Sequence, residues 1–250
     1  MSVLERIDLA LATRMVRGVH DDEPLAAAQR VLDGVRRPTS DDVPFAGALL
    51  RLRGFVVHDD DVADVFAGRQ GRLASVTQEH RLLCGVKECL RLIRERATAA
   101  RTPDGWFLVE LFRALTAELP RFRNNDLRRG PPWDAVLYLD YPPADQLRFL
   151  LDTFDEEHCY RDVPAMFQSL HPVRQGLRIL WRFARIAPFP DFNALVAWLG
   201  MNAWLQARGL PMLAPANGDQ QLMVRLLSGP PPTRSPALET RVLAAFGESM

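Results

Sequence analysis

The sequence predicts a mainly α-helical protein with one small β-hairpin, and three observations support this class. Apolar residues recur at three- and four-residue spacing across most of the chain, in the ranges 3–17, 24–35, 61–67, 76–98, 105–119 and 143–155. Two longer helix-rich segments begin at His171 and Asn193. Only residues 121–143 differ, because turn residues there precede a short strand-like run at 135–139.

Several helix ends are marked by residues typical of such positions. Asp59 to Asp61 precede or begin one helix, where acidic side chains are favoured. Pro172 stands where a first-turn proline is tolerated, and His171 before it is expected to be a cap or a surface residue. Gly209 is expected to end the last long helical segment.

The composition is that of an ordinary globular protein. The chain has 250 residues, of which 48% are hydrophobic and 25% charged, enough for one large domain or a core domain with an N-terminal addition. The formal net charge is zero, so no nucleic-acid partner is expected. Lys87 is the only lysine and no Gly-Lys-Ser/Thr sequence exists, which excludes a Walker-type phosphate loop.

The N-terminus and the cysteines predict a cytoplasmic protein. Glu5, Arg6 and Asp8 interrupt the first apolar residues, so this segment cannot act as a secretory signal. No uncharged apolar run approaches the roughly 20 residues that cross a bilayer, and no membrane partner is expected. Three cysteines, an odd number, suggest free thiols in a reducing compartment.

The stretch IAPFPDFN, residues 186–193, separates the last two long apolar segments. A loop that leads into a helix N-terminus can bind an anion, because unpaired backbone N–H groups point outward there. Two interpretations stay open from these residues alone. Either Asp191 or Asn193 only caps the helix, or Asp191 holds a divalent cation such as Mg²⁺ while Asn193 helps to hold phosphates.

Residues 164–211 resemble the core of the Fic/Doc (Fido) family. Members of that family have a segment HPF-x-(D/E)-GNGR-x-x-R, then an apolar helix that often ends near Gly-Leu-Pro. The residues that fall in register without a gap are Ile186, Pro188, Phe189, Asp191, Asn193, Met201, Asn202, Gly209, Leu210 and Pro211. Residues 122–123, 135–139 and 141–143 resemble the family's β-hairpin flap, and residues 75–80 loosely resemble its inhibitory motif.

This resemblance implies a domain organisation and a fold. We expect an N-terminal helical extension over residues 1–70 and a Fic-like helical domain over 71–250. Within that domain, the flap would cover about 121–143 and the turn equivalent to the family's active site would cover 186–198.

The departures from the family pattern imply that AMP transfer is lost. Ala187 stands where the family has its catalytic histidine, and a general base typically contributes about 10²–10⁴-fold to the rate. Phe192 and Ala194 replace two phosphate-binding glycines, and their Cβ atoms would penalise a positive φ. Leu195 and Trp198 replace the two arginines that would neutralise phosphate charge.

The loss of these groups also removes the basis for the family's autoinhibition. The inhibitory glutamate of the family pairs with the second arginine, whose position is Trp198 here. Glu79 is therefore expected to be a vestigial regulatory residue, either exposed or capping a helix.

Arg174, Arg178, Arg182 and Arg185 form one stripe along the helix that enters the turn. The stripe is either a solvated basic face, or Arg185 reaches an anion in the altered pocket while one of the middle arginines pairs with a carboxylate. The candidate ligand-binding residues are Phe189, Asp191, Asn193 and Arg185, with Asp191 as the candidate metal ligand.

Two other groups of metal-ligand residue types are expected to have no such role. His80, Cys84 and Cys89 share helical spacing and are expected to pack. The run at 155–159 would scatter its side chains around a helix.

Two functional hypotheses follow. The first is a pseudoenzyme, a Fic-like scaffold that binds a protein or peptide, for example by strand addition at the flap. The second is an enzyme with non-standard chemistry on a nucleotide, a nucleotide sugar or a small metabolite in a remodelled pocket. Mg²⁺ is expected only if a nucleotide still binds, and no other cofactor is expected.

The shape of the turn discriminates between these hypotheses. A pocket filled by Phe192 and Trp198 would favour the scaffold. An open cavity that Asp191 and Asn193 face, joined by Arg185 or Arg123, would favour a ligand-binding enzyme.

Overall fold

A computed structural model describes residues 42–99, 101–123, 126–135, 139–154, 170–229 and 235–247. Within these residues the regular secondary structure is helical and no strand is present, which confirms the mainly α-helical class. The predicted β-hairpin is not seen in the described parts of 121–143, and residues 136–138 of its strand lie outside the described residues. The helices predicted at 3–17 and 24–35 also lie outside them.

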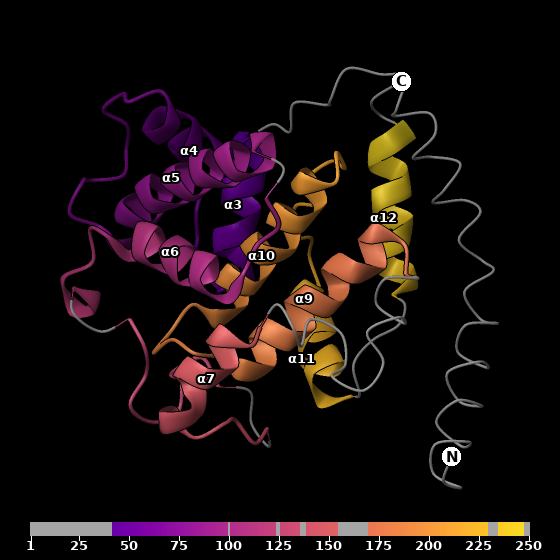
Figure 1. Cartoon of the computed structure of the whole chain (residues 1–250). Helices are drawn as coiled ribbons and strands as arrows, with labels where there is room; N and C mark the ends of the chain where they lie inside the picture. The colour runs from indigo at the N-terminus through magenta and orange to yellow at the C-terminus, as the bar shows by residue number, and fades with distance from the viewer. Residues whose placement is uncertain are drawn as a thin grey trace, which may run out of the picture.

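The two long helices α9 (Pro172–Ile186) and α10 (Asn193–Ala207) pack against each other in the middle of the molecule (Figure 1). His171 caps α9, because its Nδ1 accepts a hydrogen bond of 3.3 Å from Val173 N, as expected for a cap. Helix α10 is apolar on all sides and buried along most of its length, which is the pattern of a core helix.

Three helices pack against α10: α3 (Asp42–Leu52), α5 (Gln78–Thr98) and α6 (Gly105–Thr116) (Figure 1). Helix α4 (Asp59–Phe66) packs on α3 and α5. Side-chain caps begin two of them. Thr77 Oγ1 accepts from His80 N at 3.2 Å before α5, and Asp104 Oδ1 accepts from Phe107 N at 2.6 Å before α6. These helices follow the predicted segments 76–98 and 105–119 closely, because the apolar periodicity that predicted them is the face that they bury.

The remaining helices are short and lie along α6 and α9. The 3₁₀ turns η2 (Pro120–Phe122) and η3 (Ala144–Gln146) precede α7 (Leu147–Asp152), which contacts α6. Helices α11 (Asp219–Ser228) and α12 (Pro236–Gly247) both contact α9 (Figure 1).

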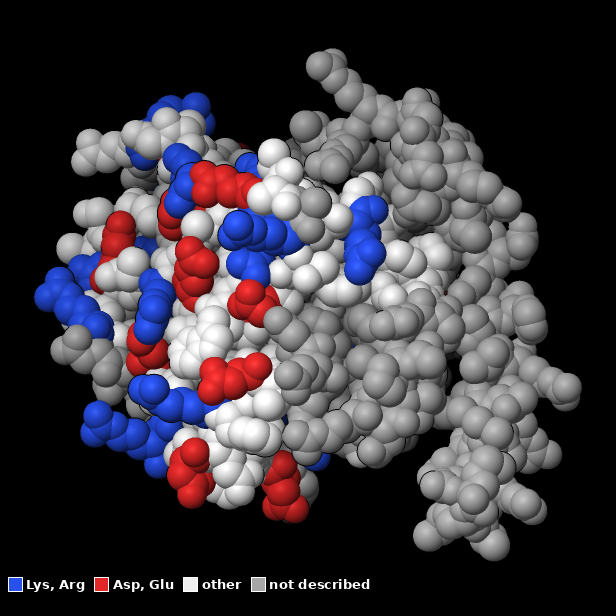
Figure 2. All heavy atoms as spheres, viewed as in Figure 1, with Lys and Arg blue, Asp and Glu red and all other residues white. Residues whose placement is uncertain are grey.

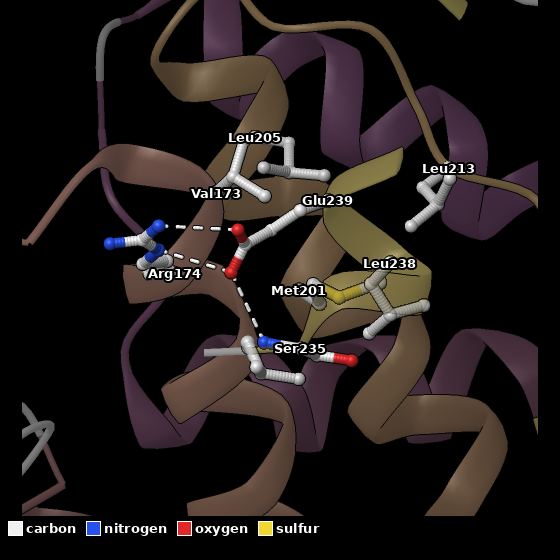
Figure 3. Close-up of a pocket in the computed structure, with 9 residues that line it drawn as sticks. Val173, Arg174, Met201, Leu205, Leu213, Ser235, Leu238 and Glu239 are labelled. Atoms are coloured by element: carbon white, nitrogen blue, oxygen red, sulfur yellow. Dashed lines mark hydrogen bonds and ion pairs between the residues drawn. The ribbon is translucent and has the colours of Figure 1, made fainter. Parts of the chain in front are cut away.

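Part of the arginine stripe on α9 lies inside the protein. Arg174 and Arg178 are 2% and 1% exposed, so the expectation of a solvated basic face is wrong for these two residues. Arg174 donates to both carboxylate oxygens of Glu239 at 3.1 and 3.2 Å, which joins α9 to α12 (Figure 3). Burial of a guanidinium requires such a partner, and a partner so distant in the sequence leaves no mark in the local pattern.

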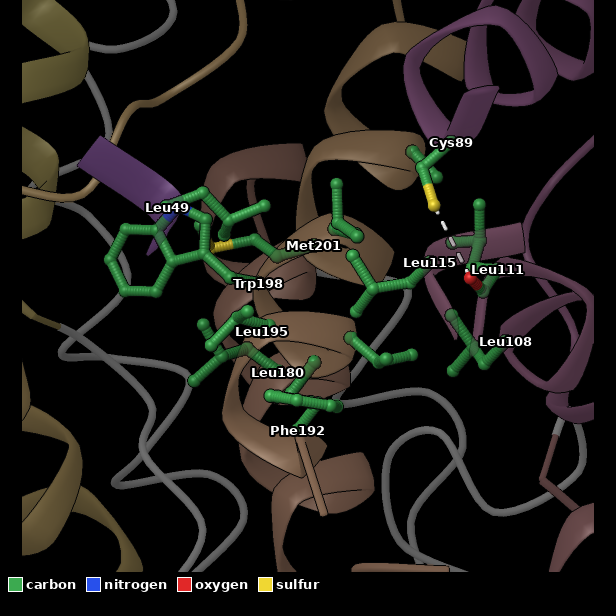
Figure 4. Close-up of a cluster of buried hydrophobic side chains, with 14 of the residues drawn as sticks. Leu49, Cys89, Leu108, Leu111, Leu115, Leu180, Phe192, Leu195, Trp198 and Met201 are labelled. Atoms are coloured by element: carbon green, nitrogen blue, oxygen red, sulfur yellow. Dashed lines mark hydrogen bonds between the residues drawn. The ribbon is translucent and has the colours of Figure 1, made fainter. Parts of the chain in front are cut away.

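One hydrophobic core joins these helices (Figure 4). It extends from Phe45 on α3 through α5, α6, α9 and α10 to Leu238 on α12. Helices α3 and α4 lie within the expected N-terminal extension, yet their apolar side chains belong to this same core, so the core has no break at residue 70.

One face of the described surface carries charges of both signs. On the face shown in Figure 2, basic and acidic side chains alternate rather than forming a patch of one sign. Among the described helices, none combines the length and the apolar character that a bilayer crossing requires.

Candidate functional site at the turn between α9 and α10

The backbone of the turn is held in two left-handed conformations. Ala187 ends α9 with φ 43° and ψ 63°, and Phe192 precedes α10 with φ 62° and ψ 19°. A non-glycine residue in this region costs on the order of 1–3 kcal/mol, so surrounding contacts must hold it. At Phe192 these contacts are aromatic, because its buried ring lies 5.6 Å from the ring of Phe122 and 6.3 Å from that of Phe55.

Phe192 and Ala194, the two positions where the resemblance implies glycine, differ in backbone conformation. Phe192 has a positive φ despite its side chain, whereas Ala194 lies in helix α10 and has no positive φ. The penalty on a Cβ at positive φ therefore concerns Phe192, and the helical conformation of Ala194 does not incur it.

Asn193 closes the turn on itself. Its Oδ1 accepts from Phe189 N at 2.9 Å, and its Nδ2 donates to Phe189 O at 3.0 Å. Phe189 is fully buried and stacks on Phe112, with ring centroids 4.0 Å apart and planes 7° apart. The candidate ligand-binding residue Phe189 is thus placed in the core, where it anchors the turn.

A carboxylate from another loop sits at the N-terminus of α10. Asp134 Oδ2 accepts from Asn193 N and Asp134 Oδ1 accepts from Asn193 Nδ2, both at 2.7 Å. An anion is favoured at this point because the helix dipole and the free N–H groups meet there. Burial raises the pKa of the Asp134 carboxyl, and the hydrogen bonds from Asn193 oppose that rise.

Asp191, the candidate metal ligand, is already paired. Its Oδ1 accepts from Arg53 Nε at 3.1 Å, from Arg53 Nη2 at 3.0 Å and from Phe192 N at 2.7 Å. Arg121 Nη2 approaches its Oδ2 at 3.4 Å. Two guanidinium groups beside a carboxylate that is 4% exposed oppose a divalent cation, which needs the same lone pairs.

The loop that contains Asp134 is docked on the turn by backbone and side-chain contacts. Arg128, which is 6% exposed, donates from Nε to Ala187 O at 2.7 Å and from Nη2 to Pro142 O at 2.6 Å. Arg128 N donates to Pro188 O at 2.9 Å. Since the guanidinium meets the last carbonyls of α9, its charge also complements the C-terminal end of that helix.

A cleft of about 600 Å³ opens beside the turn, a volume in the range of small-molecule sites. Helices α3 and α11 and the loop around Asp134 form its walls. Its lining is mostly apolar: Leu52, Arg53, Trp133, Asp134, Ala135, Tyr141, Ala184, Ala187, Asn193, Ala194, Gln220, Met223, Val224 and Leu227.

Leu195 and Trp198, where the resemblance implies arginines, do not line this cleft. Leu195 and Trp198 are fully buried and point into the core together with Phe192 (Figure 4). Trp198 Nε1 donates to Leu213 O at 2.8 Å, which gives the indole a structural partner.

The cleft has little net charge. Arg53 and Asp134 are the charged residues among the described residues that line it, and their signs are opposite. Arg185, the predicted anion-binding residue, instead donates to Leu227 O at 3.1 Å, and neither Arg185 nor Arg123 lines the cleft. Of the four predicted ligand-binding residues, Asn193 lines the cleft, beside Ala187.

Glu79 lies in the first turn of α5, where a carboxylate is favoured by the helix dipole. Sequence reasoning missed Asp134, Arg53 and Arg128. Asp134 and Arg128 contact the turn across 59 positions of sequence and Arg53 across 138, and no local pattern signals such contacts.

Sequence comparison finds no matching family model and no matching curated protein. Solved structures do match. A Fic-domain-containing signalling protein from Bacteroides thetaiotaomicron is 14% identical, with a TM-score of 0.68 over 96% of this chain and 94% of that one. Fic-1 from C. elegans, residues 134–508, is 14% identical, with a TM-score of 0.64 over 98% of this chain and 73% of that one.

A Fic family protein from Desulfovibrio desulfuricans is 15% identical and gives a TM-score of 0.53 over 96% of this chain and 72% of that one. Identities this low establish the fold alone. The chain therefore has the fold of Fic-domain proteins.

Proposed function

We propose that this protein is a Fic-fold pseudoenzyme that does not transfer AMP, and that its cleft binds a small molecule of low charge. The observation that carries the proposal is the Asp134 carboxylate at the N-terminus of α10, 2.7 Å from Asn193 N. The position at which the family motif would hold phosphate is thus taken by an anion of the chain itself.

The absence of a general base and of positively charged side chains at these positions supports the first part of the proposal, the loss of AMP transfer. Ala187 lines the cleft and has no group that could accept a proton from a hydroxyl. Leu195 and Trp198 are buried in the core, so these positions offer no positive charge to a transferring phosphoryl group.

Electrostatics at the turn also oppose nucleotide phosphates. Two like unit charges about 4 Å apart repel by about 4 kcal/mol at the effective dielectric constant near a protein surface. A phosphate that approached Asn193 would meet Asp134 in this way. Arg53, the nearby cation, is already bound to Asp191.

The cleft supports the second part of the proposal. Its volume of about 600 Å³ and mostly apolar lining suit a ligand that is largely apolar. Because the charges of Arg53 and Asp134 are opposite, the lining has no net charge that would attract a multiply charged group. The proposal takes the loss of transfer chemistry from the first hypothesis and the small-molecule site from the second.

Thermal unfolding in the presence of ligands tests the first part. The panel contains nucleotides, nucleotide sugars and cytidine-diphosphate alcohols, each with and without Mg²⁺. A ligand at 100 times its Kd adds about 2.7 kcal/mol, and for a chain of this size the midpoint would rise by roughly 5–10 °C. We expect no shift, whereas a Mg²⁺-dependent shift that Asp191→Ala abolishes would overturn this part.

The uncharged fluorophore 1-N-phenylnaphthylamine tests the second part. We expect its fluorescence to rise on binding, and the rise to be lost in Val224→Trp, which narrows the cleft at a residue that is 41% exposed. Val76→Trp is the matched control, because Val76 is 72% exposed and does not line the cleft. Equal fluorescence in both variants would contradict a site in the cleft.

The scaffold version, in which a peptide adds a strand at the flap, involves residues 136–138 outside the described residues. It remains a prediction. Deletion of residues 124–140 with retained capture of the partner would exclude it.

A further inference from the structure

A second group of ligand-type side chains lies away from the cleft, where α5 begins and α6 ends. His80 and Cys84 are four positions apart on α5 and therefore share one face of the helix. Glu118 follows the end of α6. Cys84 Sγ lies 3.8 Å from His80 Nδ1, and one ligand atom from each of the three residues lies within 4.8 Å of the others.

Helix packing holds these three residues in place. At Gly85, next to Cys84, a Cβ atom would lie 2.3 Å from Leu115 O, so α5 and α6 are in backbone contact there. One turn further along, Cys89 Sγ donates to Leu111 O at 3.2 Å and Cys89 is fully buried (Figure 4). The expected packing role is thus confirmed for Cys89, whereas Cys84 remains partly exposed beside His80.

We propose that His80, Cys84 and Glu118 bind a divalent transition-metal ion of the Zn²⁺ class. Thiolate sulfur, imidazole nitrogen and carboxylate oxygen are the ligands that Zn²⁺ takes in proteins, at about 2.3 Å for sulfur and about 2.0–2.1 Å for nitrogen. In a tetrahedral site these lengths separate the sulfur and the nitrogen by about 3.6 Å. The observed 3.8 Å between these two atoms is longer by only a few tenths of an ångström. The three ligand atoms lie within 4.8 Å of one another, so binding must also draw in the side chain of the exposed Glu118.

The number and exposure of the ligands indicate an open site. Three protein ligands leave the fourth tetrahedral position for water or a small molecule. Glu118 is exposed and the other two residues are partly buried, so an ion can enter from solvent. The ion would join the first turns of α5 to the end of α6 and thereby stabilise the folded chain.

Binding should release a proton. Burial and the neighbouring Glu118 carboxylate raise the pKa of the Cys84 thiol, while Lys87 opposes this. Zn²⁺ binds the thiolate form of cysteine, so binding exchanges the thiol proton for a sulfur–metal bond.

Titration of the full-length, reduced and metal-free protein with Co²⁺ tests the site. We expect one Co²⁺ per chain, with the thiolate-to-Co²⁺ charge-transfer band and the visible bands of tetrahedral Co²⁺, and displacement by Zn²⁺. Cys84→Ser should abolish the charge-transfer band. His80→Gln and Glu118→Gln should each weaken the Kd at least about tenfold, which is about 1.4 kcal/mol.

Two controls make the outcome decisive. The double variant Cys89→Ala/Cys159→Ser keeps Cys84 as the only cysteine of the three in the sequence and should retain the spectrum. Glu118 is exposed, so Glu118→Gln keeps the fold and the test does not depend on variants of the partly buried ligands. No charge-transfer band in the native chain, a band that persists in Cys84→Ser, or an unchanged Kd in Glu118→Gln would each overturn the proposal.

Discussion

The left-handed conformation of Phe192 leads to a prediction that reverses the usual ranking of alanine and glycine. Replacement of this buried ring by alanine removes a large part of the core beside Phe55 and Phe122 and should cost about 3–5 kcal/mol. The alanine variant must still place a Cβ at φ 62°, which costs about 1–2 kcal/mol relative to an ordinary conformation. The glycine variant loses the same ring but does not have this penalty.

The unfolded chain reduces the difference without changing its sign. Glycine has more conformational freedom when unfolded, which favours alanine by about 0.4–1 kcal/mol. Phe192→Gly should therefore be more stable than Phe192→Ala by roughly 0.8 kcal/mol, the difference between the midpoints of these two opposing effects. For a chain of this size that is a difference of about 1–4 °C in Tm.

Denaturant unfolding followed by circular dichroism measures this difference. The matched control is Ala194→Gly in the first turn of α10, where φ is not positive and glycine should reduce stability by about 0.5–1 kcal/mol. If Phe192→Ala proves as stable as Phe192→Gly or more so, the turn does not hold its positive φ in solution and the reasoning fails.

Three further predictions concern the contacts around the turn and the helix crossing. The pKa of the Asp134 carboxyl is raised from its ordinary value of 3.8, so the folded state holds the carboxyl proton more tightly than the unfolded chain does. The free energy of unfolding should therefore fall as pH rises through the raised pKa, and Asp134→Asn should lack this fall. Urea unfolding measured from pH 4 to 7 tests this, and parallel pH profiles of the two proteins would contradict it. Arg128→Met should destabilise the protein by about 2–4 kcal/mol in denaturant unfolding, because buried carbonyls such as Ala187 O lose a charged donor, whereas Arg123→Met at an exposed site should change little. Gly85→Ala should lower Tm and weaken Co²⁺ binding together, since its Cβ would force α5 away from Leu115; an unchanged Tm would show that the two helices are not in backbone contact.

The helices were predictable because their signals are local. Apolar spacing located α5 and α6, the residues before Pro172 located the start of α9, and the proline-containing stretch located the turn before Asn193. Each of these features depends on neighbouring residues or on one turn of helix.

The contacts of the site were not predictable, because they join residues that are far apart in the sequence. Asp134 reaches Asn193 from a separate loop, and Arg53 reaches Asp191 from α3. Residue type alone gives Asp191 the same appearance whether it binds a cation or two arginines. Arg174 had the appearance of a surface residue because its partner Glu239 lies 65 positions further along the chain.

The family resemblance drew attention to the turn between α9 and α10 but did not indicate how its side chains are packed. Phe192 and Trp198 were candidates to fill a pocket, and the structure buries both in the core instead. The positive φ at Phe192 shows that packing can hold a residue with a side chain in a conformation that glycine adopts more readily.

The central claim is that Asp134 occupies the anion position at the N-terminus of α10. Calorimetric titration of pyrophosphate into the native protein and into Asp134→Ala tests it most directly. We predict no binding to the native protein and measurable binding to the variant, because removal of the carboxylate frees Asn193 N for an external anion. Binding of pyrophosphate to the native protein with the same affinity as to Asp134→Ala would contradict the claim.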